Sequence, residues 1–206
     1  MLGLLRRTFS TSIPVNSKKQ LYISLIRSQF MYCSVLWKPY LVKHIQLIEC
    51  VQRRATKYIL NNYTSDYKSR LLKLHILPLM YILDLNDIMF FIRNLKTNHN
   101  GFDIKTFIPF ITGNTRLAAS HKLQHNRSTD SLTNNFYFSR FPHLWNALPI
   151  ININLHPDTI KQKLLYYFWD HFESNFESSN ACSFSFLCCC SKCNNQPSTA
   201  NFDNLN

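Results

Sequence analysis

The stretch that decides the fold of this chain, residues 17–60, reads SKKQLYISLIRSQFMYCSVLWKPYLVKHIQLIECVQRRATKYIL. Apolar residues recur in it every three or four positions, first over residues 21–36 and again over residues 45–59. This spacing is typical of helices that bury one face. We therefore predict two helices, the first capped by Ser17 and joined to the second by a turn around Pro39.

The opposite face of this predicted hairpin is basic, and it carries a single acid, Glu49. A helical surface with a packed side and a cationic side suits the phosphate backbone of a nucleic acid. The candidate backbone contacts are, in the first place, Lys43, Arg53, Arg54 and Lys57, and in the second place Lys18, Lys19 and Arg27.

The charge of the 206-residue chain, net +12, is unevenly spread. Residues 1–100 contain 15 Lys and Arg against 4 Asp and Glu, whereas residues 101–206 contain 8 against 7. Such asymmetry favours a nucleic acid or an acidic membrane surface as a partner of the front half. The alternative is that the basic residues only keep a helical surface soluble.

The composition also bears on the fold. A hydrophobic content of 46% is enough for a core. The chain has only 3 glycines, and this small number argues against a Gly-rich phosphate loop.

Two further helices are predicted upstream of residue 97. A short one covers Tyr67–Leu74, and a long one, opened by Pro78, covers Leu79–Lys96. The long helix is apolar nearly all round, so we expect it to be central. Asp84 and Asp87 lie one turn apart on it and could hold a metal, form a solvated strip or pair with an Arg or Lys.

The rest of the chain is less regular. We predict a loop-rich connector over residues 102–135, with a short hairpin as one option, and residues 136–149 are dense in aromatics. A final helix, Thr159–Phe172, is predicted to be capped by Asp158. The fold class is thus mainly α: a helical bundle (residues 1–97), a loop-rich and helical region (98–175) and a Cys-rich, partly disordered tail (176–206).

The tail contains the one candidate metal site. Its zinc ligands would be the four thiolates of Cys182, Cys188, Cys190 and Cys193, of which the last two form a Cys-x2-Cys pair. Unpaired thiols and S-acylation of the same cysteines are the alternatives. We expect Cys33 and Cys50 to be buried thiols.

The sequence contains no Walker-type loop, no His-Glu-x-x-His and no nucleophile elbow. It also contains no apolar run long enough to span a membrane and no secretory signal. We therefore expect no catalysis by the chain alone and an intracellular location, in the nucleus or the cytoplasm, without disulfides.

Six segments form an ordered set of motifs. They are Leu2–Phe9 (LGLLRRTF), Leu21–Pro39 (LY-x2-LIRS, then YCS-x2-W-x-P), Ile48–Lys57 (IE-x2-QRRATK), Tyr67–Leu79 (Y-x2-RL-x2-L-x2-LPL), Phe138–Pro149 (FSR, then LWN-x-LP) and Cys188–Cys193 (CCC-x2-C). In this order, over residues 1–193, they resemble the carboxy-terminal part of the reverse transcriptase of non-LTR (LINE-type) retrotransposons. The tail departs from the similar CPC-x2-C ending of some animal elements, because cysteine replaces the proline.

The resemblance implies a thumb-like helical bundle that grips RNA or an RNA–DNA template–primer duplex. It also implies what has no counterpart here: the endonuclease, the fingers, and the palm whose Tyr-x-Asp-Asp carboxylates hold Mg²⁺ for polymerisation. We therefore expect no polymerase activity from this chain on its own, although the parent family is an RNA-directed DNA polymerase. We further expect that Met1 is an internal methionine of a truncated element whose palm, if it exists, is encoded elsewhere.

Three interpretations of the function are open at this point. The chain could bind RNA or an RNA–DNA hybrid; it could be a relic open reading frame without a selected activity; or it could be a zinc-binding interaction module that depends on the tail. Cooperative thermal unfolding, metal content and salt-dependent binding to nucleic acid distinguish them.

Overall fold

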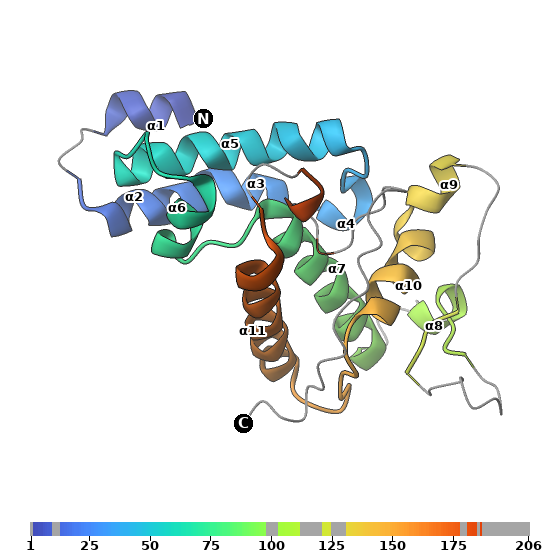
Figure 1. Cartoon of the computed structure of the whole chain (residues 1–206). Helices are drawn as coiled ribbons and strands as arrows, with labels where there is room; N and C mark the ends of the chain where they lie inside the picture. Colours follow the sequence, from blue (N-terminus) through green and yellow to red (C-terminus); the bar gives the residue numbers. More distant parts are fainter. Residues whose placement is uncertain are drawn as a thin grey trace. The chain divides into compact units, whose positions relative to one another are not determined.

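The computed structural model of the chain describes residues 2–9, 13–97, 103–111, 121–124, 131–177, 181–184 and 186. Within these ranges the protein is mainly α-helical, as predicted, and its one β feature is an isolated antiparallel bridge between Phe110 and Leu123. The elements, shown in Figure 1, are α1 (Leu2–Thr8), α2 (Val15–Leu21), the π-helix η1 (Tyr22–Arg27), α3 (Ser28–Met31), α4 (Ser34–Trp37), α5 (Val42–Leu60), α6 (Tyr67–Leu74), α7 (Leu79–Lys96), α8 (Ile104–Phe107), α9 (Ser131–Asn135), α10 (Tyr137–Ala147), α11 (Pro157–Asn175) and the 3₁₀-helix η2 (Ala181–Phe184).

Two compact units make up the chain. The described residues of the first unit come from residues 1–83 and 169–188, and those of the second unit come from residues 84–168. The division passes through α7 and α11, so each of these helices contributes to both units. The division into three domains expected from the sequence stays a prediction.

The first helix of the predicted hairpin is broken in the structure, contrary to the expectation from its spacing. It begins at Val15, after Pro14, so Ser17 lies inside α2 and does not cap it. After a π-helical turn and α3, the chain becomes extended at Tyr32 and left-handed at Cys33, whose φ is 49°. A helix cannot continue through such a residue, so α4 starts afresh.

The second helix of the hairpin, α5, is uninterrupted and ends at Asn61, a left-handed residue with φ 48°. Its buried side chains lie along one side of the helix and are Ile45, Glu49, Gln52, Ala55, Thr56 and Ile59. The acid Glu49 therefore lies on the packed side of α5, away from the basic face to which the sequence had assigned it.

Glu49 and Gln52 are the centre of a buried polar network in the first unit. The Glu49 carboxylate accepts hydrogen bonds from the Tyr67 hydroxyl and from the backbone N–H of Leu79, the latter at 3.0 Å. Gln52 accepts from the Tyr22 hydroxyl at 2.8 Å and donates to the Leu77 carbonyl at 3.0 Å. These bonds join α5 to η1, to α6 and to the start of α7.

Two more features complete this network. Arg27 donates to the Leu77 carbonyl at 3.4 Å and lies close enough to Glu49 to attract its charge. Burial raises the pKa of Tyr22 and Tyr67, so both hydroxyls stay protonated and act as donors. Tyr22, Glu49, Gln52 and Tyr67 thus all have hydrogen-bond partners within the network, as buried polar groups require.

The next two helices after α5, α6 and α7, begin and end where the sequence predicts. The Asp66 side chain accepts from the Lys68 N–H at 3.0 Å and caps α6, which ends at the left-handed residue His75. α7 covers the predicted range, Leu79–Lys96, and is buried on nearly all sides. Tyr81 in its first turn packs against Phe172 and Phe186, with ring centroids 6.3 Å and 6.4 Å away.

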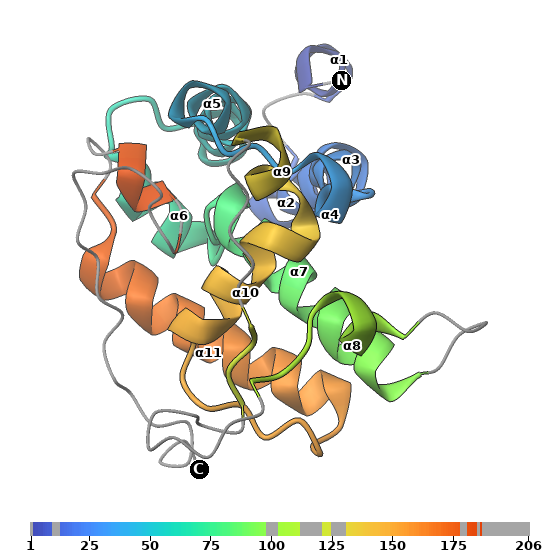
Figure 2. The same cartoon turned by 90° about the vertical axis from the view of Figure 1, so that its right-hand side faces the viewer.

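Aromatic side chains form the core of the second unit, in which Figure 2 shows α8 and α10. Phe91 of α7 packs against Phe141 and Trp145 of α10, with ring centroids 4.8 Å and 5.0 Å away. The Asn146 side chain pairs with both backbone groups of Leu123, at 2.8 Å and 2.9 Å. The region predicted as an aromatic-rich stretch is thus a helix that holds residues 121–124 against the core.

For Asp87, the structure distinguishes between the solvated strip and the pairing with an Arg or Lys, two of the alternatives that the sequence left open. Its carboxylate, 1% exposed, forms an ion pair with Arg140 of α10, with atoms 3.1 Å apart. The Tyr137 hydroxyl donates to the Asp87 carbonyl at 2.9 Å. Asp87 therefore pairs with an arginine and does not form a solvated strip.

The last helix, α11, is longer than predicted, and Asp158 lies in its first turn, not at its cap.

Among the described residues, no single helix is long and apolar enough to cross a membrane; α6 and α7, bent by 51° at their junction, pass that test only as a pair.

The first prediction concerns Glu49. Burial raises its pKa, and the hydrogen bonds from Tyr67 and Leu79 oppose this shift only in part. A raised pKa in the folded state means that the acid contributes most stability below its unfolded pKa of about 4.3 and loses it as the pH rises through the folded value. We expect the free energy of unfolding of the wild type, minus that of Glu49→Gln, to fall over this window in urea titrations. A difference that stays flat or rises with pH would contradict the burial of an acid here.

Candidate nucleic-acid interface

The cations of α5 lie on one side of the helix. With 3.6 residues per turn, Lys43, Arg54 and Lys57 fall within an arc of about 60° around the helix axis, and Arg53 lies about 40° beyond it. Lys43 and Arg54 are exposed, and Lys57 is half-buried. The buried side of the helix, centred on Gln52, points in roughly the opposite direction. We name Lys43, Arg53, Arg54 and Lys57 the α5 cationic face.

No exposed carboxylate opposes this face in the part of the chain that the structure describes up to the end of α5. Glu49 is the only Asp or Glu among residues 1–65, and it is 1% exposed. The described surface of α1 to α5 is therefore free of exposed acid, and an approaching phosphate meets only positive charge there. The fold produces this property by taking the one acid of the segment into the interior.

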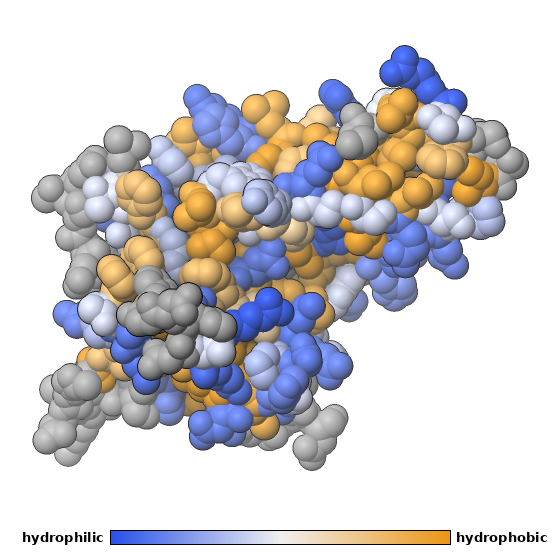
Figure 3. Space-filling view, turned by 180° about the vertical axis from the view of Figure 1, so that it is seen from behind, coloured by the Kyte–Doolittle hydropathy of each residue, from blue (hydrophilic) through white to orange (hydrophobic). Residues whose placement is uncertain are grey.

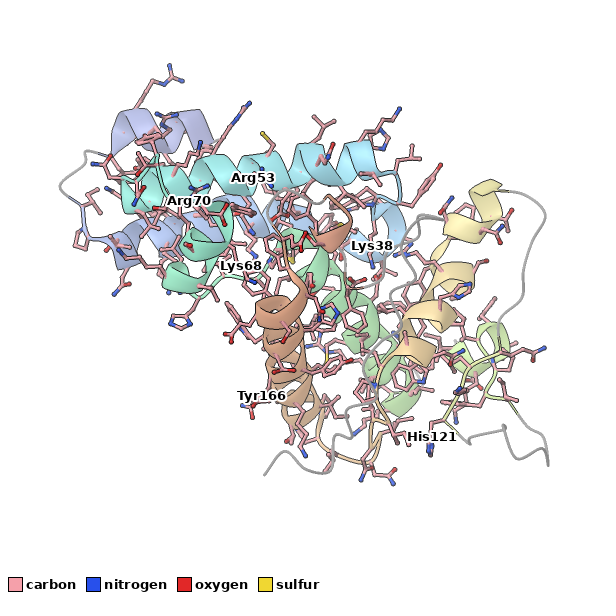
Figure 4. All side chains as sticks on the ribbon, in the orientation of Figure 1. Lys38, Arg53, Lys68, Arg70, His121 and Tyr166 are labelled. Atoms are coloured by element: carbon pink, nitrogen blue, oxygen red, sulfur yellow. The ribbon has the colours of Figure 1, made fainter. Side chains whose placement is uncertain are left out.

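Arg53 is held at the edge of the α5 cationic face by two aromatic rings. Its guanidinium lies 4.8 Å from the ring centroid of Tyr67 in α6 and 5.0 Å from that of Phe184 in η2. Figure 4 labels Arg53 on α5, with η2 nearby. Both separations are within the range of cation–π attraction. Arg53 thus carries charge at the surface and also fastens η2 to α5.

The structure does not bring the second-rank cations to this face. Lys18 is buried, with its ammonium group 5.4 Å from the ring centroid of Tyr58. Arg27 turns toward the Glu49 network, and burial lowers the pKa of its guanidinium. Lys19 is half-buried on α2. The side chains of Lys18 and Arg27 make contacts within the first unit, and we therefore do not include them in the interface.

Two arginines that were not among the predicted contacts lie beside it. Arg6 and Arg7 are exposed on α1, and the Tyr58 hydroxyl of α5 donates to the α1 carbonyl of Leu5 at 3.3 Å. This bond ties α1 to the end of α5 that carries Lys57. Two adjacent arginines in the sequence could have indicated a phosphate contact. Their position near α5, however, follows only from the packing of α1 on α5.

The predicted zinc site lies largely outside the described residues. Cys182 belongs to η2, whereas Cys188, Cys190 and Cys193 are outside the described ranges, so the site stays a prediction. Within those ranges, no three His, Cys, Asp or Glu side chains come together as metal ligands. Cys33 was expected to be buried but is exposed, because it lies at the break after α3, and Cys50 is half-buried.

Comparisons of the chain with protein-family models, with curated proteins and with solved structures gave no match. The resemblance to reverse transcriptases therefore depends on the sequence motifs, and a nucleic-acid partner is a matter for proposal.

The second prediction separates the two adjacent arginines of the α5 cationic face. Arg53→Ala should lower the free energy of unfolding by about 1–2 kcal/mol, because it removes two cation–π contacts. Arg54→Ala, at an exposed site, should change it by less than about 0.5 kcal/mol. Chemical denaturation followed by circular dichroism measures both. Equal effects of the two substitutions would show that Arg53 is not held by Tyr67 and Phe184.

Proposed function

We propose that this chain binds RNA or an RNA–DNA hybrid through its phosphate backbone and does not polymerise on its own. The observation that carries the proposal is the acid-free described surface of α1 to α5, on which Lys43, Arg54 and Lys57 share one side of a helix. The sequence motifs add the expectation that the chain is the thumb and downstream region of a non-LTR retrotransposon reverse transcriptase.

The size of the α5 cationic face suits a nucleic-acid backbone. From Lys43 to Lys57 the helix rises about 21 Å at 1.5 Å per residue. Successive phosphates of one duplex strand are about 3.4 Å apart along the axis, so the face spans about six of them. Four cations over this length can each meet a phosphate.

Contacts of this kind position a nucleic acid without reading its sequence. Lys and Arg bound to phosphate oxygens carry no information about the bases. The binding should therefore be sequence-tolerant and should weaken as salt rises, because each neutralised phosphate releases counterions. These two properties distinguish the proposed backbone binding from the binding of a protein that recognises a specific base sequence.

The third prediction is that reversing charge on the α5 cationic face abolishes binding. The variant Lys43→Glu, Arg54→Glu, Lys57→Glu keeps all contacts of Arg53 and the buried side of α5. We expect the wild type to bind an RNA–DNA hybrid with a steep salt dependence and the variant to lose at least about 100-fold in affinity at low salt. Fluorescence anisotropy with labelled hybrid measures both.

The matched control reverses three exposed cations of the second unit, Arg93→Glu, Lys105→Glu and Lys161→Glu, so that the net charge changes equally. This control should bind within a few-fold of the wild type. If the control and the α5 variant lose affinity equally, net charge alone explains the binding, and the assignment of α5 as the interface is refuted.

The alternative of a relic without activity has one structural feature in its favour. The first unit exposes large apolar side chains, among them Leu4 (54%), Leu25 (41%) and Leu47 (68%), and Figure 3 shows apolar surface gathered on the rear of the molecule. Such surfaces favour aggregation when a partner is lacking. A cooperative thermal transition in dilute, monomeric protein would count against the relic, and a featureless melt with precipitation would support it.

A further inference from the structure

An exposed aromatic segment lies directly before α5. We name residues 32–41 the aromatic elbow, because they connect α3 to α5 through the break at Cys33. Tyr32 is 77% exposed, and Trp37 and Tyr40 are each 39% exposed. Three aromatic rings are thus exposed within one ten-residue segment.

The aromatic elbow is rigid for a connection of its length. The Trp37 indole N–H donates to the Tyr32 carbonyl at 2.8 Å, which closes the segment on itself. Cys33 is fixed in the left-handed region, and the α4 turn begins next to it. Pro39 restricts the backbone once more before α5. The backbone that carries the rings therefore has little conformational freedom left to lose on binding.

Positive charge adjoins these rings. Lys38 lies within the aromatic elbow, as Figure 4 shows, and Lys43 is exposed in the first turn of α5. The nearest acid in the sequence, Glu49, is buried. Aromatic faces interleaved with cations, in the absence of exposed acid, are the surface that proteins use to bind unpaired nucleotides: the rings stack on bases and the cations meet phosphates.

We propose that the aromatic elbow binds unpaired nucleotides of a single-stranded RNA or DNA segment, with Tyr32 as the main stacking ring and Lys43 as a phosphate contact. This inference rests on the proposed function and narrows it, because it names the strand state of the ligand. Bases within a duplex are already stacked and paired, so only an unpaired or frayed strand can offer a base face to Tyr32.

A protein partner is the competing occupant, because Leu36 of the same segment is 80% exposed. Charge complementarity decides between the two. A protein surface that covers the aromatic elbow would have to desolvate Lys38 and Lys43, whereas a polynucleotide neutralises them while its bases cover the rings.

The fourth prediction tests this inference with the full chain. We expect the wild type to bind an unstructured single-stranded RNA about tenfold or more tightly than a blunt duplex of the same sequence at the same salt. Tyr32→Ala should weaken single-strand binding about tenfold and leave duplex binding within about twofold, because one base–ring contact is lost. Tyr32→Phe should restore the affinity, since the ring and not the hydroxyl makes the contact.

The matched control is Tyr166→Ala on α11, labelled in Figure 4, because Tyr166 is an exposed tyrosine (59%) of the second unit. It should leave single-strand affinity unchanged. Circular dichroism of each variant verifies that the helices are intact. An equal loss for single strand and duplex in Tyr32→Ala, or no loss in either, would overturn the inference.

The remaining outcomes are separable. If the wild type binds no nucleic acid, the proposed function fails and the inference fails with it. If charge reversal on α5 abolishes binding but Tyr32→Ala has no effect, the inference alone fails. If sedimentation shows a wild-type dimer that Leu36→Ala makes monomeric, and no preference for single strands is found, the aromatic elbow is a protein interface and the inference is likewise overturned.

Discussion

The first unit depends on one carboxylate held in an apolar interior. Glu49 accepts hydrogen bonds from Tyr67 and from the N–H of Leu79, while Gln52, one turn further along α5, bonds with Tyr22 and the Leu77 carbonyl. A buried charge without partners costs several kcal/mol, so these helices can pack on α5 only in an arrangement that satisfies it. The network therefore selects an arrangement of helices that apolar contacts alone would leave open.

The same carboxylate determines the electrostatics of the outer surface. If Glu49 lay among Lys43, Arg54 and Lys57, it would neutralise part of their field and could form surface ion pairs with them. Buried on the opposite side of α5, it leaves their charge unopposed at the surface. The position of Glu49 on α5 thus has two consequences: a hydrogen-bonded polar network in the interior, and a cationic face without an exposed acid.

The sequence predicts some elements to the residue and misses others for physical reasons. α6 and α7 have the predicted ranges, and α7 follows Pro78, its predicted opening residue; the cap of α6 by Asp66 is a local signal that the prediction did not use. The break after α3 has no such signal, because neither Tyr32 nor Cys33 is a glycine or a proline, and Cys33 is nevertheless left-handed. The burial of Lys18 on Tyr58 likewise depends on a contact between residues forty positions apart.

The place of Glu49 could have been read from the sequence. It follows Ile45 by four positions and precedes Gln52 and Thr56 by three and seven, which is the spacing of the packed side of α5. An acid on an apolar stripe signals a buried polar network, and the tyrosines at positions 22 and 67 are natural donors to it. The sequence alone does not show which hydrogen-bond donors reach the Glu49 carboxylate, because this depends on how the helices pack.

The motif residues that carry the resemblance to reverse transcriptases fall into two groups: some are interior, and others, such as Tyr32 and Arg54, are exposed. Tyr22, Glu49, Gln52 and Tyr67 form the polar network of the first unit, and Asn146 pins an extended segment in the second. Residues in such roles are constrained by packing, so a resemblance built on them bears on the fold more than on the ligand. The ligand must be argued from the surface, where Lys43, Arg54 and Lys57 of α5 and the rings of the aromatic elbow lie outside that network, whereas Arg53 contacts its Tyr67. Binding measurements on variants of these exposed residues therefore test the function and leave the buried network in place.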